Sequence, residues 1–422
     1  MQAQPCHTTD TIAIESPQAC VMPNPIPALS VTAFTATSAL GQGLDAHRAA
    51  LGAGRSGLKP NDFSSEPLAC WIGRVEGIEA AALPEPLATW DCRNNRLAWL
   101  GLNQDDFVGA VRVARERYGA DRIALVLGTS TASIGATEEA YRRLDADGRI
   151  PADLRRREIH VPHSLTGFVA AALALNGPTL TVSTACSSSA KAFAHAERMI
   201  RLGVVDAAVV GGVDTLCDST LFGFNALELI SPEPCKPFDR ARRGISIGEA
   251  AGFALLERSD CAPDAPRLLG YGESSDAHHM STPHPQGLGA ELAMRDALAR
   301  AGLQAAHVDY INLHGTASMK NDEVEAQLIT RNFPSTTRAS STKALTGHTL
   351  GAAGIVEAVI ALLAIADDTV PGNAGCDEPD VHCGPQWALR NESRRVDVAL
   401  SNSFGFGGNN ICLAFAQAER SP

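Results

Sequence analysis

Residues 181–200, which read TVSTACSSSAKAFAHAERMI, place a single cysteine between a buried strand and a helix. Residues 179–183 are short and rich in β-branched side chains, which predicts a strand. From Ala190 to Ile200, apolar residues recur at helical spacing, so Cys186 falls at or next to the first helical turn. N–H groups and the positive dipole end there favour the thiolate and can hold an oxyanion. We predict a reactive nucleophile, although a cysteine taken alone is more often a buried core residue.

The composition is that of a soluble globular enzyme. The chain has 422 residues, 45% hydrophobic and 19% charged, with 37 glycines, which predicts tightly packed α/β layers in two domains or one large double-layered unit. No apolar run approaches the roughly 20 residues that span a bilayer. The first 25 residues lack the pattern of a secretory signal. We therefore expect no membrane span and a cytoplasmic protein.

Cysteine spacing and charge exclude several classes of site and partner. The eleven cysteines form no CxxC pair and do not alternate with histidines, which argues against a disulfide scaffold and predicts no metal site. A net charge of −12 argues against nucleic acid as a partner. An acidic partner would need a local basic cluster, and two candidates exist. They are Arg155–Arg156–Arg157 and the run of Lys236, Arg240, Arg242 and Arg243.

Alternating strand-like and helix-like segments predict a parallel sheet covered on both faces. Residues 1–25 show no periodicity and are expected to be a flexible extension. Strands are predicted in residues 29–40, 122–127 and 204–213, and residues 223–249 look like a loop near a site. A composition break at residues 258–267 predicts two halves, residues 26–262 and 263–422.

The second half repeats the arrangement of the first. A predicted strand at residues 308–313 delivers His314 to its carboxyl end, and Lys343 and His348 follow in Ser-Thr-Lys-Ala-Leu-Thr-Gly-His. A glycine-rich turn at residues 402–410 precedes the last strand. Ligands of layered α/β folds bind at the carboxyl ends of strands. We therefore expect these groups and Cys186 to form one site, and the echo between halves suggests duplication.

Four motifs in order resemble the elongating β-ketoacyl-acyl-carrier-protein synthases, types I and II, of the thiolase-like superfamily. The resemblance runs from about residue 29 to residue 416. The matching residues are Thr184–Ala185–Cys186–Ser187–Ser188, His314–Gly315–Thr316 with Asn321, Asp322 and Glu325, residues 341–354 with Lys343, His348 and Glu357, and residues 402–408.

This resemblance implies a five-layered αβαβα fold of two duplicated halves, and a dimer. It also implies an acyltransferase that performs a decarboxylative Claisen condensation in fatty acid or polyketide synthesis. Cys186 would hold the acyl chain as a thioester, and His314 and His348 would stabilise the enolate of the malonyl thioester. No tightly bound cofactor is expected, since both substrates would arrive on the phosphopantetheine of an acyl carrier protein.

The resemblance also assigns roles around these three residues. The N–H groups of Cys186 and Phe406 would form the oxyanion hole. The remaining roles are charge and support for the histidines (Lys343 with Glu357, Asp322 and Glu325), pantetheine binding (Thr316 and Ser318) and the acyl-pocket gate (Phe224 and Phe406). For carrier-protein docking we predict the basic cluster of Arg155, Arg156 and Arg157.

Several positions depart from the family pattern. Glu228 lies where type II enzymes tend to carry an arginine that faces the carrier protein, residues 129–134 differ from the usual glycine-rich turn, and Asn409–Asn410 replaces Thr-Asn. In these departures the chain resembles the synthases of aryl polyene assembly, whose partner is a chain-length-factor-like subunit. We therefore leave open a homodimer or a heterodimer.

Four other readings compete with an elongating synthase. A thiolase needs a second cysteine in residues 401–410, which contain none, and a type III synthase would show Cys-His-Asn. A cysteine hydrolase leaves the second histidine and Lys343 unexplained. A non-catalytic, chain-length-factor-like partner subunit is the main alternative, and the presence of Cys186 argues against it.

Overall fold

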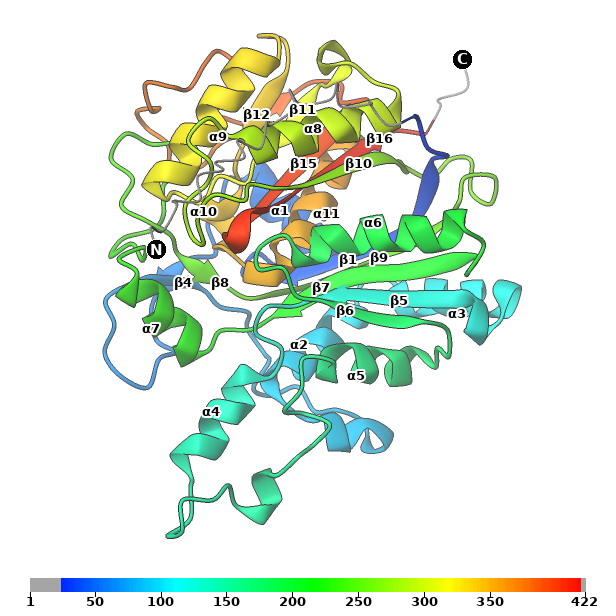
Figure 1. The fold of residues 1–422 in the computed structure, drawn as a ribbon, viewed down its shortest axis with the longest axis vertical. Coiled ribbons are helices and arrows are strands. Elements are labelled where there is room, and N and C mark those ends of the chain that lie inside the picture. The colour runs from blue at the N-terminus through cyan, green and yellow to red at the C-terminus, as the bar shows by residue number, and fades with distance from the viewer. Residues whose placement is uncertain (1–23, 419–422) are drawn as a thin grey trace, which may run out of the picture.

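The computed structural model describes residues 24–418, so that residues 1–23 of the predicted N-terminal extension lie outside the described part (Figure 1). Ten strands form one long mixed sheet in the order β12-β11-β15-β16-β10-β1-β9-β7-β5-β6, and the short β2 (Gly41–Gln42) pairs with β1. The ten strands are β1 (Leu29–Ser38), β5 (Ile123–Gly128), β6 (Thr179–Val182), β7 (Ala207–Asp214), β9 (Ala250–Arg258), β10 (Arg267–Ser275), β11 (Tyr310–Asn312), β12 (Arg338–Ser340), β15 (Val398–Gly405) and β16 (Asn409–Ala416).

The sheet consists of two five-stranded halves with the same topology. In the first, β6, β5 and β7 are parallel, whereas β9 and β1 follow in antiparallel pairing. In the second, β12, β11 and β15 are parallel, and β16 and β10 follow in the same way. Among the described residues, β1 and β10 pair across the halves at Leu29 with Leu268 and at Ser30 with Arg267. The predicted duplication is therefore confirmed, whereas the domain limits at 262 and 263 stay a prediction.

Two expectations about the sheet were wrong. The sheet is mixed and not parallel, because strands buried on both faces have the same apolar pattern in either orientation. Residues 402–410 are mostly strand, since the β15–β16 hairpin pairs Gly405 with Asn409 and leaves a three-residue turn. The predicted strands near residues 29–40, 122–127 and 204–213 are present as β1, β5 and β7.

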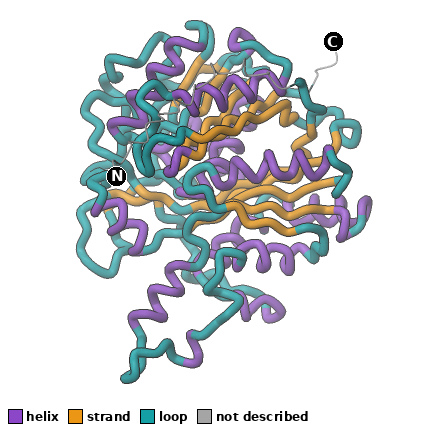
Figure 2. Tube along the Cα trace, viewed as in Figure 1, coloured by secondary structure: helices purple, strands orange, loops and turns teal. Residues whose placement is uncertain are grey.

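Helices and sheet halves alternate in five layers, as Figures 1 and 2 show. One outer layer contains α8 (Leu288–Ala301) and α9 (Met319–Asn332), and the other contains α2 (Arg93–Leu102), α3 (Phe107–Tyr118) and α5 (Ser164–Leu173). Between the sheet halves lie α6 (Ser188–Arg201) and α11 (Ala353–Ala366). The remaining helices are α1 (Gly43–Gly52), α4 (Ile134–Arg142), α7 (Asp218–Ala226) and the short, fully buried α10 (Lys343–Thr346). This is the predicted five-layered αβαβα architecture.

The sequence of α11 explains its central position. Every residue from Ala353 to Ile365 is buried, and Glu357 is the only charged one. A helix that is apolar all round requires cover on all sides, which two sheets and a neighbouring helix provide. It meets α6 closely, because a Cβ on Gly354 would lie 2.7 Å from the Cβ of Ala190.

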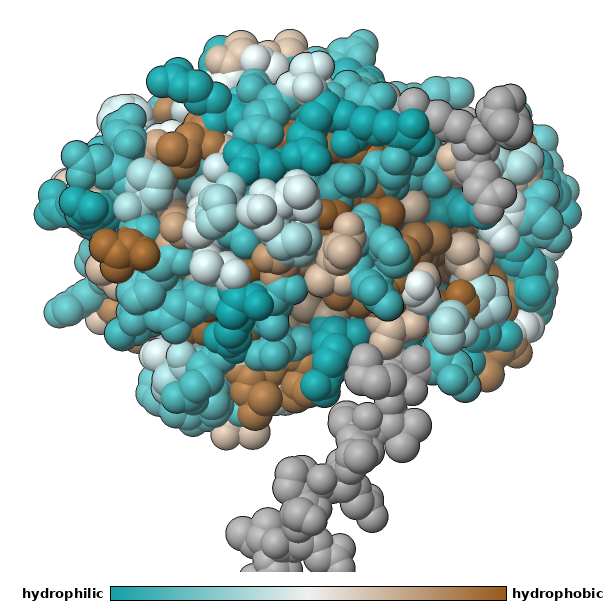
Figure 3. Space-filling view, turned by 90° about the horizontal axis from the view of Figure 1, so that it is seen from above, coloured by the Kyte–Doolittle hydropathy of each residue, from teal (hydrophilic) through white to brown (hydrophobic). Residues whose placement is uncertain are grey.

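The outer layers face solvent. The side seen from above in Figure 3 is mostly hydrophilic, with apolar residues in small groups. Residues of α8 such as Ala293 and Ala297 are buried against the sheet, so these helices turn one face inward. Among residues 24–418, no helix is both long and apolar enough to cross a lipid bilayer.

Candidate active site

Cys186 sits in a tight turn between β6 and α6. Ala185 adopts the left-handed region, with φ of 54°, which costs about 1–3 kcal/mol for a residue other than glycine. The Ser188 hydroxyl accepts a bond from the Thr184 N–H at 2.9 Å and donates one to the Ala185 carbonyl at 2.6 Å. These bonds fix the turn and present the thiol just ahead of the helix, which begins at Ser188.

His348 faces the thiol directly. Its Nε2 lies 2.9 Å from Sγ of Cys186, and both residues are buried. The backbone of His348 is held at both ends, because its N–H donates to the Ser246 carbonyl at 2.7 Å and its carbonyl accepts from the Gly248 N–H at 2.9 Å. The ring is therefore positioned by the short strand β8 (Ile247–Gly248).

His314 follows β11 and meets the same space from another side. Its ring lies 5.5 Å from that of His348 at an interplanar angle of 86°. Glu325 on α9 accepts the N–H groups of His314 and Gly315 at 2.9 and 2.8 Å. Burial raises the pKa of Glu325 to about 7, although these hydrogen bonds lower it. Glu325 therefore fixes the turn that carries His314 without touching the ring.

Lys343 links His314 to a buried carboxylate. Its ammonium donates to the Glu357 carboxylate and to the His314 carbonyl, and lies 3.5 Å from Nδ1 of His314. The side chains of Lys343 and Glu357 are 2% and 4% exposed. Burial raises the pKa of Glu357, which the adjacent ammonium opposes. The three groups form one buried chain between α10, α11 and the turn after β11.

The site differs from our expectation of a resting thiolate. Complete burial raises the pKa of Cys186 to about 12, and the charge of Lys343 offsets only part of that effect. Burial also lowers the pKa values of His314 and His348 well below their usual range, with Lys343 contributing. The thiol and both imidazoles are therefore neutral at pH 7. The helix-start argument was wrong because it ignored the loss of water around the sulfur.

The turn after β15 completes the thiol's surroundings. The N–H of Phe406 hydrogen-bonds toward Cys186 and lowers the thiol pKa slightly. Gly405 is needed here because a Cβ would lie 2.7 Å from the Thr184 carbonyl oxygen. The Phe406 ring lies 5.7 Å from that of Phe224 on α7, so these two predicted gate residues are in contact.

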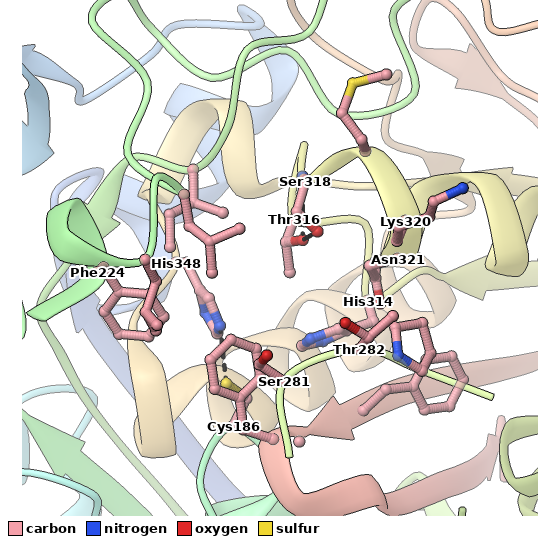
Figure 4. A pocket seen from close by; sticks show the side chains of 18 of the residues that line it. Cys186, Phe224, Ser281, Thr282, His314, Thr316, Ser318, Lys320, Asn321 and His348 are labelled. Carbon is pink, nitrogen blue, oxygen red and sulfur yellow. Dashed lines mark hydrogen bonds between the residues drawn. The ribbon is translucent and has the colours of Figure 1, made fainter. Parts of the chain in front are cut away.

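Thr316 and Ser318 lie farther up the cavity than the imidazoles, as Figure 4 shows. Their hydroxyls are 3.0 Å apart. Asp322 accepts the N–H groups of Thr316 at 3.0 Å and of Ala317 at 3.1 Å, and burial raises the pKa of its carboxyl. Asp322 thus shapes the hydroxyl-bearing turn and does not face the cavity.

A cavity of about 380 Å³ joins these groups to the surface. Cys186, His314 and His348 line its inner end, and Phe224, Phe406, Thr316 and Ser318 line its walls. Its mouth carries exposed charged residues, Glu228, Arg243 and Lys320, and exposed apolar ones, Leu227, Met280 and Met319. The predicted loop at residues 223–249 therefore does border the site.

The two predicted basic clusters lie outside the cavity or are partly buried. Arg155, Arg156 and Arg157 do not line the cavity, and Arg156 donates to the Asp91 carbonyl at 2.7 Å. Their docking role stays a prediction. In the second run, Arg242 is buried and donates to Asp380 at 2.6 Å, so this residue cannot form part of a surface cluster.

The sequence reading missed two parts of the site. Asp276 and residues 279–283 line the cavity after β10. The Asp276 N–H donates to the Gly408 carbonyl, and the Met280 carbonyl accepts the Gly407 N–H. A polar, proline-containing loop after a strand was the available signal. Buried Asp214 accepts N–H groups of Thr131 and Gly351 at 2.8 and 2.6 Å, which ties the unusual turn at residues 129–134 to the segment after His348.

Comparison with known proteins gives a consistent family. Residues 110–262 match the β-ketoacyl synthase N-terminal domain and residues 266–377 the C-terminal domain. A 3-oxoacyl-[acyl-carrier-protein] synthase 2 from Synechocystis sp. is 31% identical over 92% of this chain and 98% of its own. Nodulation protein E from Rhizobium meliloti is 36% identical over 70% and 76%.

Solved structures agree. A ketosynthase in complex with its chain length factor from Xenorhabdus doucetiae is 37% identical, with a TM-score of 0.84 over 93% of this chain and 98% of that one. The ishigamide ketosynthase/chain length factor is 28% identical, with a TM-score of 0.83 over 93% and 99%. Because both synthase domains match and a relative is 31% identical over nearly its whole length, the chain belongs to the β-ketoacyl synthase family of the thiolase-like superfamily.

Proposed function

We propose that this protein is a β-ketoacyl-acyl-carrier-protein synthase that extends an acyl chain held on Cys186 by condensation with a malonyl thioester. The observation that carries the proposal is the convergence of the Cys186 thiol with His314 and His348 at the inner end of one cavity. A thiol supplies a covalent acyl carrier, and two neutral imidazoles supply N–H donors for an enolate.

In the loading step, the Cys186 sulfur attacks the thioester carbonyl of an acyl carrier. His348 accepts the thiol proton, because its Nε2 is 2.9 Å from Sγ. The proton leaves with the departing pantetheine thiol. A neutral thiol–imidazole pair suits this exchange, since the sulfur becomes charged only while the carbon–sulfur bond forms.

Decarboxylation then uses both histidines. An ammonium can only donate, so the proximity of Lys343 to Nδ1 of His314 leaves the ring proton on Nε2, which faces the cavity. The Nε2–H of His314 would bind the malonyl thioester oxygen. His348 would donate in the same way after its ring proton has moved from Nδ1 to Nε2 by exchange with solvent, once the acylated sulfur no longer carries a proton. As carbon dioxide leaves, its bonding electrons form the enolate, and these two donors stabilise the charge.

Condensation ends at the oxyanion hole. The enolate carbon attacks the acyl-cysteine carbonyl, whose oxygen takes the negative charge and accepts the N–H groups of Cys186 and Phe406. Collapse breaks the carbon–sulfur bond and releases the Cys186 thiolate, which takes up a proton from solvent. Gly405 supports this step because its missing side chain lets the Phe406 turn approach Thr184.

The shape of the cavity supports a carrier-bound substrate. The route from the mouth to Cys186 passes the hydroxyls of Thr316 and Ser318, which would bind the pantetheine amides. Arg243 and Lys320 at the mouth would meet an acidic carrier, while Glu228 would disfavour an acidic residue placed opposite to it. A tightly bound cofactor has no place in this scheme, and its absence stays a prediction.

We further propose a heterodimer with a chain-length-factor-like subunit. Two similar structures, at 37% and 28% identity, contain a ketosynthase and a chain length factor. Within residues 24–418 no strand pairs with the outer edge of β6, which offers a place for a partner strand. Cys186, His314 and His348 make this chain the catalytic member. A homodimer, a polyene product and a cytoplasmic location stay predictions.

The test is intact-mass spectrometry after incubation with carrier proteins that hold different acyl groups, alone and with a co-expressed partner subunit. An acyl mass mapped to Cys186, followed by elongation with malonyl carrier, is expected. The chains that load fastest would separate fatty acid from polyene synthesis. No adduct with any donor, in either assembly, would instead support the non-catalytic partner role.

A further inference from the structure

The catalytic cluster has the composition of a metal-binding site. Ligand atoms of Cys186, His314 and His348 all lie within 4.8 Å of one another, and all three residues are buried. They come from three distant segments, so the cysteine spacing along the chain gave no sign of them. A sulfur with two imidazole nitrogens is a donor set that zinc prefers.

The distances suit a tetrahedral ion after small side-chain rotations. Zinc–sulfur and zinc–nitrogen bonds of about 2.3 and about 2.0 Å place such ligand atoms about 3.5 Å apart. Sγ of Cys186 and Nε2 of His348 are now 2.9 Å apart, and the largest separation in the cluster is within 4.8 Å. The present separations therefore bracket the spacing of about 3.5 Å that a tetrahedral zinc ion requires.

Nothing holds the His348 ring in the tautomer that would block a metal. Its Nδ1 is buried and has no hydrogen-bond partner among the described residues. The ring proton can therefore sit on Nδ1, which frees the Nε2 lone pair. For His314, the Lys343 ammonium lies 3.5 Å from Nδ1 and favours the ring proton on Nε2, so a metal ion must displace that proton to Nδ1. The two closer contacts of the ammonium are unaffected by this change.

Charges of both signs surround the cluster. Lys343 acts on Cys186 and on both imidazoles, and it opposes a cation there. Its ammonium is in contact with Glu357, which together with Asp214 acts on Cys186 in the opposite direction. A dication that replaces the thiol proton adds a single net positive charge to this surrounding.

The cavity supplies both an entry route and a fourth ligand. Cys186, His314 and His348 form its inner end, and the cavity opens to the surface between Phe224 and Lys320. The side of the cluster that faces this space carries no protein ligand. A water molecule could complete the coordination there, which is the arrangement of an open three-ligand site.

We propose that Cys186, His314 and His348 bind Zn²⁺ reversibly, as an inhibitory site that competes with acylation of the cysteine. Binding forms the zinc–sulfur bond and releases the thiol proton to solvent, with no change in oxidation state. The ion would occupy the place of the substrate thioester. An acyl group on Cys186 removes the sulfur ligand, so an enzyme loaded with substrate is protected.

Cobalt titration tests the site, because Co²⁺ takes similar ligands and reports them by its colour. Full-length protein is freed of metal with EDTA and titrated with Co²⁺. We expect a thiolate-to-cobalt charge-transfer band and the intense visible bands of a tetrahedral ion, both removed by Zn²⁺. Zn²⁺ should also prevent alkylation of Cys186, and EDTA should restore it.

Variants separate this cluster from other thiols. Cys186→Ala should abolish the charge-transfer band, and His348→Ala should weaken Co²⁺ binding at least about tenfold. Cys261→Ala removes a partly exposed cysteine outside the cluster and should change nothing. A band that persists in Cys186→Ala, or no band in the unmodified protein, would overturn the proposal. Circular dichroism of each variant shows that it is folded.

The inference stands on the geometry of the cluster and not on the proposed reaction. The cobalt spectrum and the alkylation assay need no carrier protein and no turnover. A protein that binds cobalt through Cys186 but never loads an acyl group would refute the synthase proposal alone. A synthase that loads acyl groups but shows no cobalt–thiolate band would refute the metal proposal alone.

Discussion

Replacing Glu357 with leucine would leave the ammonium of Lys343 buried without a carboxylate. Both side chains are almost fully buried, at 2% and 4% exposure, and are in contact. Removing one member of such a pair typically costs about 3–5 kcal/mol, because the remaining charge keeps its desolvation penalty and loses its partner. The carbonyl of His314 is the other strong acceptor near that ammonium, and a carbonyl cannot neutralise it.

The double variant Lys343→Met and Glu357→Leu should recover most of that loss. Two apolar side chains of similar volume remove both charges and fill the same space, which is often neutral for stability. Decarboxylation should stay defective in the double variant, because nothing then fixes the ring of His314. The two measurements therefore separate the stability of the pair from its contribution to the site.

Chemical unfolding followed by circular dichroism measures the first quantity, and carbon dioxide release from malonyl carrier measures the second. The single variant should unfold at clearly lower denaturant than the double variant. If Glu357→Leu were as stable as the double variant, Lys343 would not carry a buried charge. Normal carbon dioxide release by the double variant would remove the pair from the function of His314.

Three further predictions follow from the same site. Cys186→Gln should abolish condensation but still release carbon dioxide from malonyl carrier, whereas His314→Ala should lose that release; elongation by the first or release by the second would contradict the scheme. The pKa values of His314 and His348 are lowered in the folded protein, so the free energy of unfolding should be at its full value above about pH 6.5 and fall below it, because the unfolded chain takes up protons there. If His314→Asn left this pH dependence of the unfolding free energy unchanged, His314 would not contribute to it. Gly405→Ala should block acyl loading and cost about 1–3 kcal/mol, because its Cβ would meet the Thr184 carbonyl; intact mass and thermal unfolding measure both.

The sequence could predict the groups that gather at the site because each follows a strand. Cys186 follows β6 and His314 follows β11, so both lie at carboxyl ends of strands, where ligands of layered α/β folds bind. This placement can be predicted without knowing which distant residues contact the site. The same local patterns located β5 and β7. The strand directions of β9 and β16 were not predictable, since a buried strand has the same composition in either direction.

Properties that depend on residues distant in the sequence, such as the pKa of a thiol or the burial of an arginine, could not be predicted from the sequence. The thiol of Cys186 was expected to ionise, but its pKa depends on water that three distant segments exclude. Arg242 belongs to a basic run in sequence, yet its partner Asp380 is 138 residues away and holds it in the interior. The loop at residues 276–283 approaches the site only because β10 lies beside β16.

The shared middle layer has a consequence for synthesis on the ribosome. α6 belongs to the first half of the chain, but it packs against α11, which lies 152 residues further on, counted between Arg201 and Ala353. Until that later helix emerges, the inward face of α6 around Ala190 lacks the neighbour that covers it in the folded protein. The growing chain must therefore carry an exposed apolar surface for the time of that elongation, at about 5–20 residues per second. Chaperone binding should be concentrated in this interval and should end once α11 has left the exit tunnel.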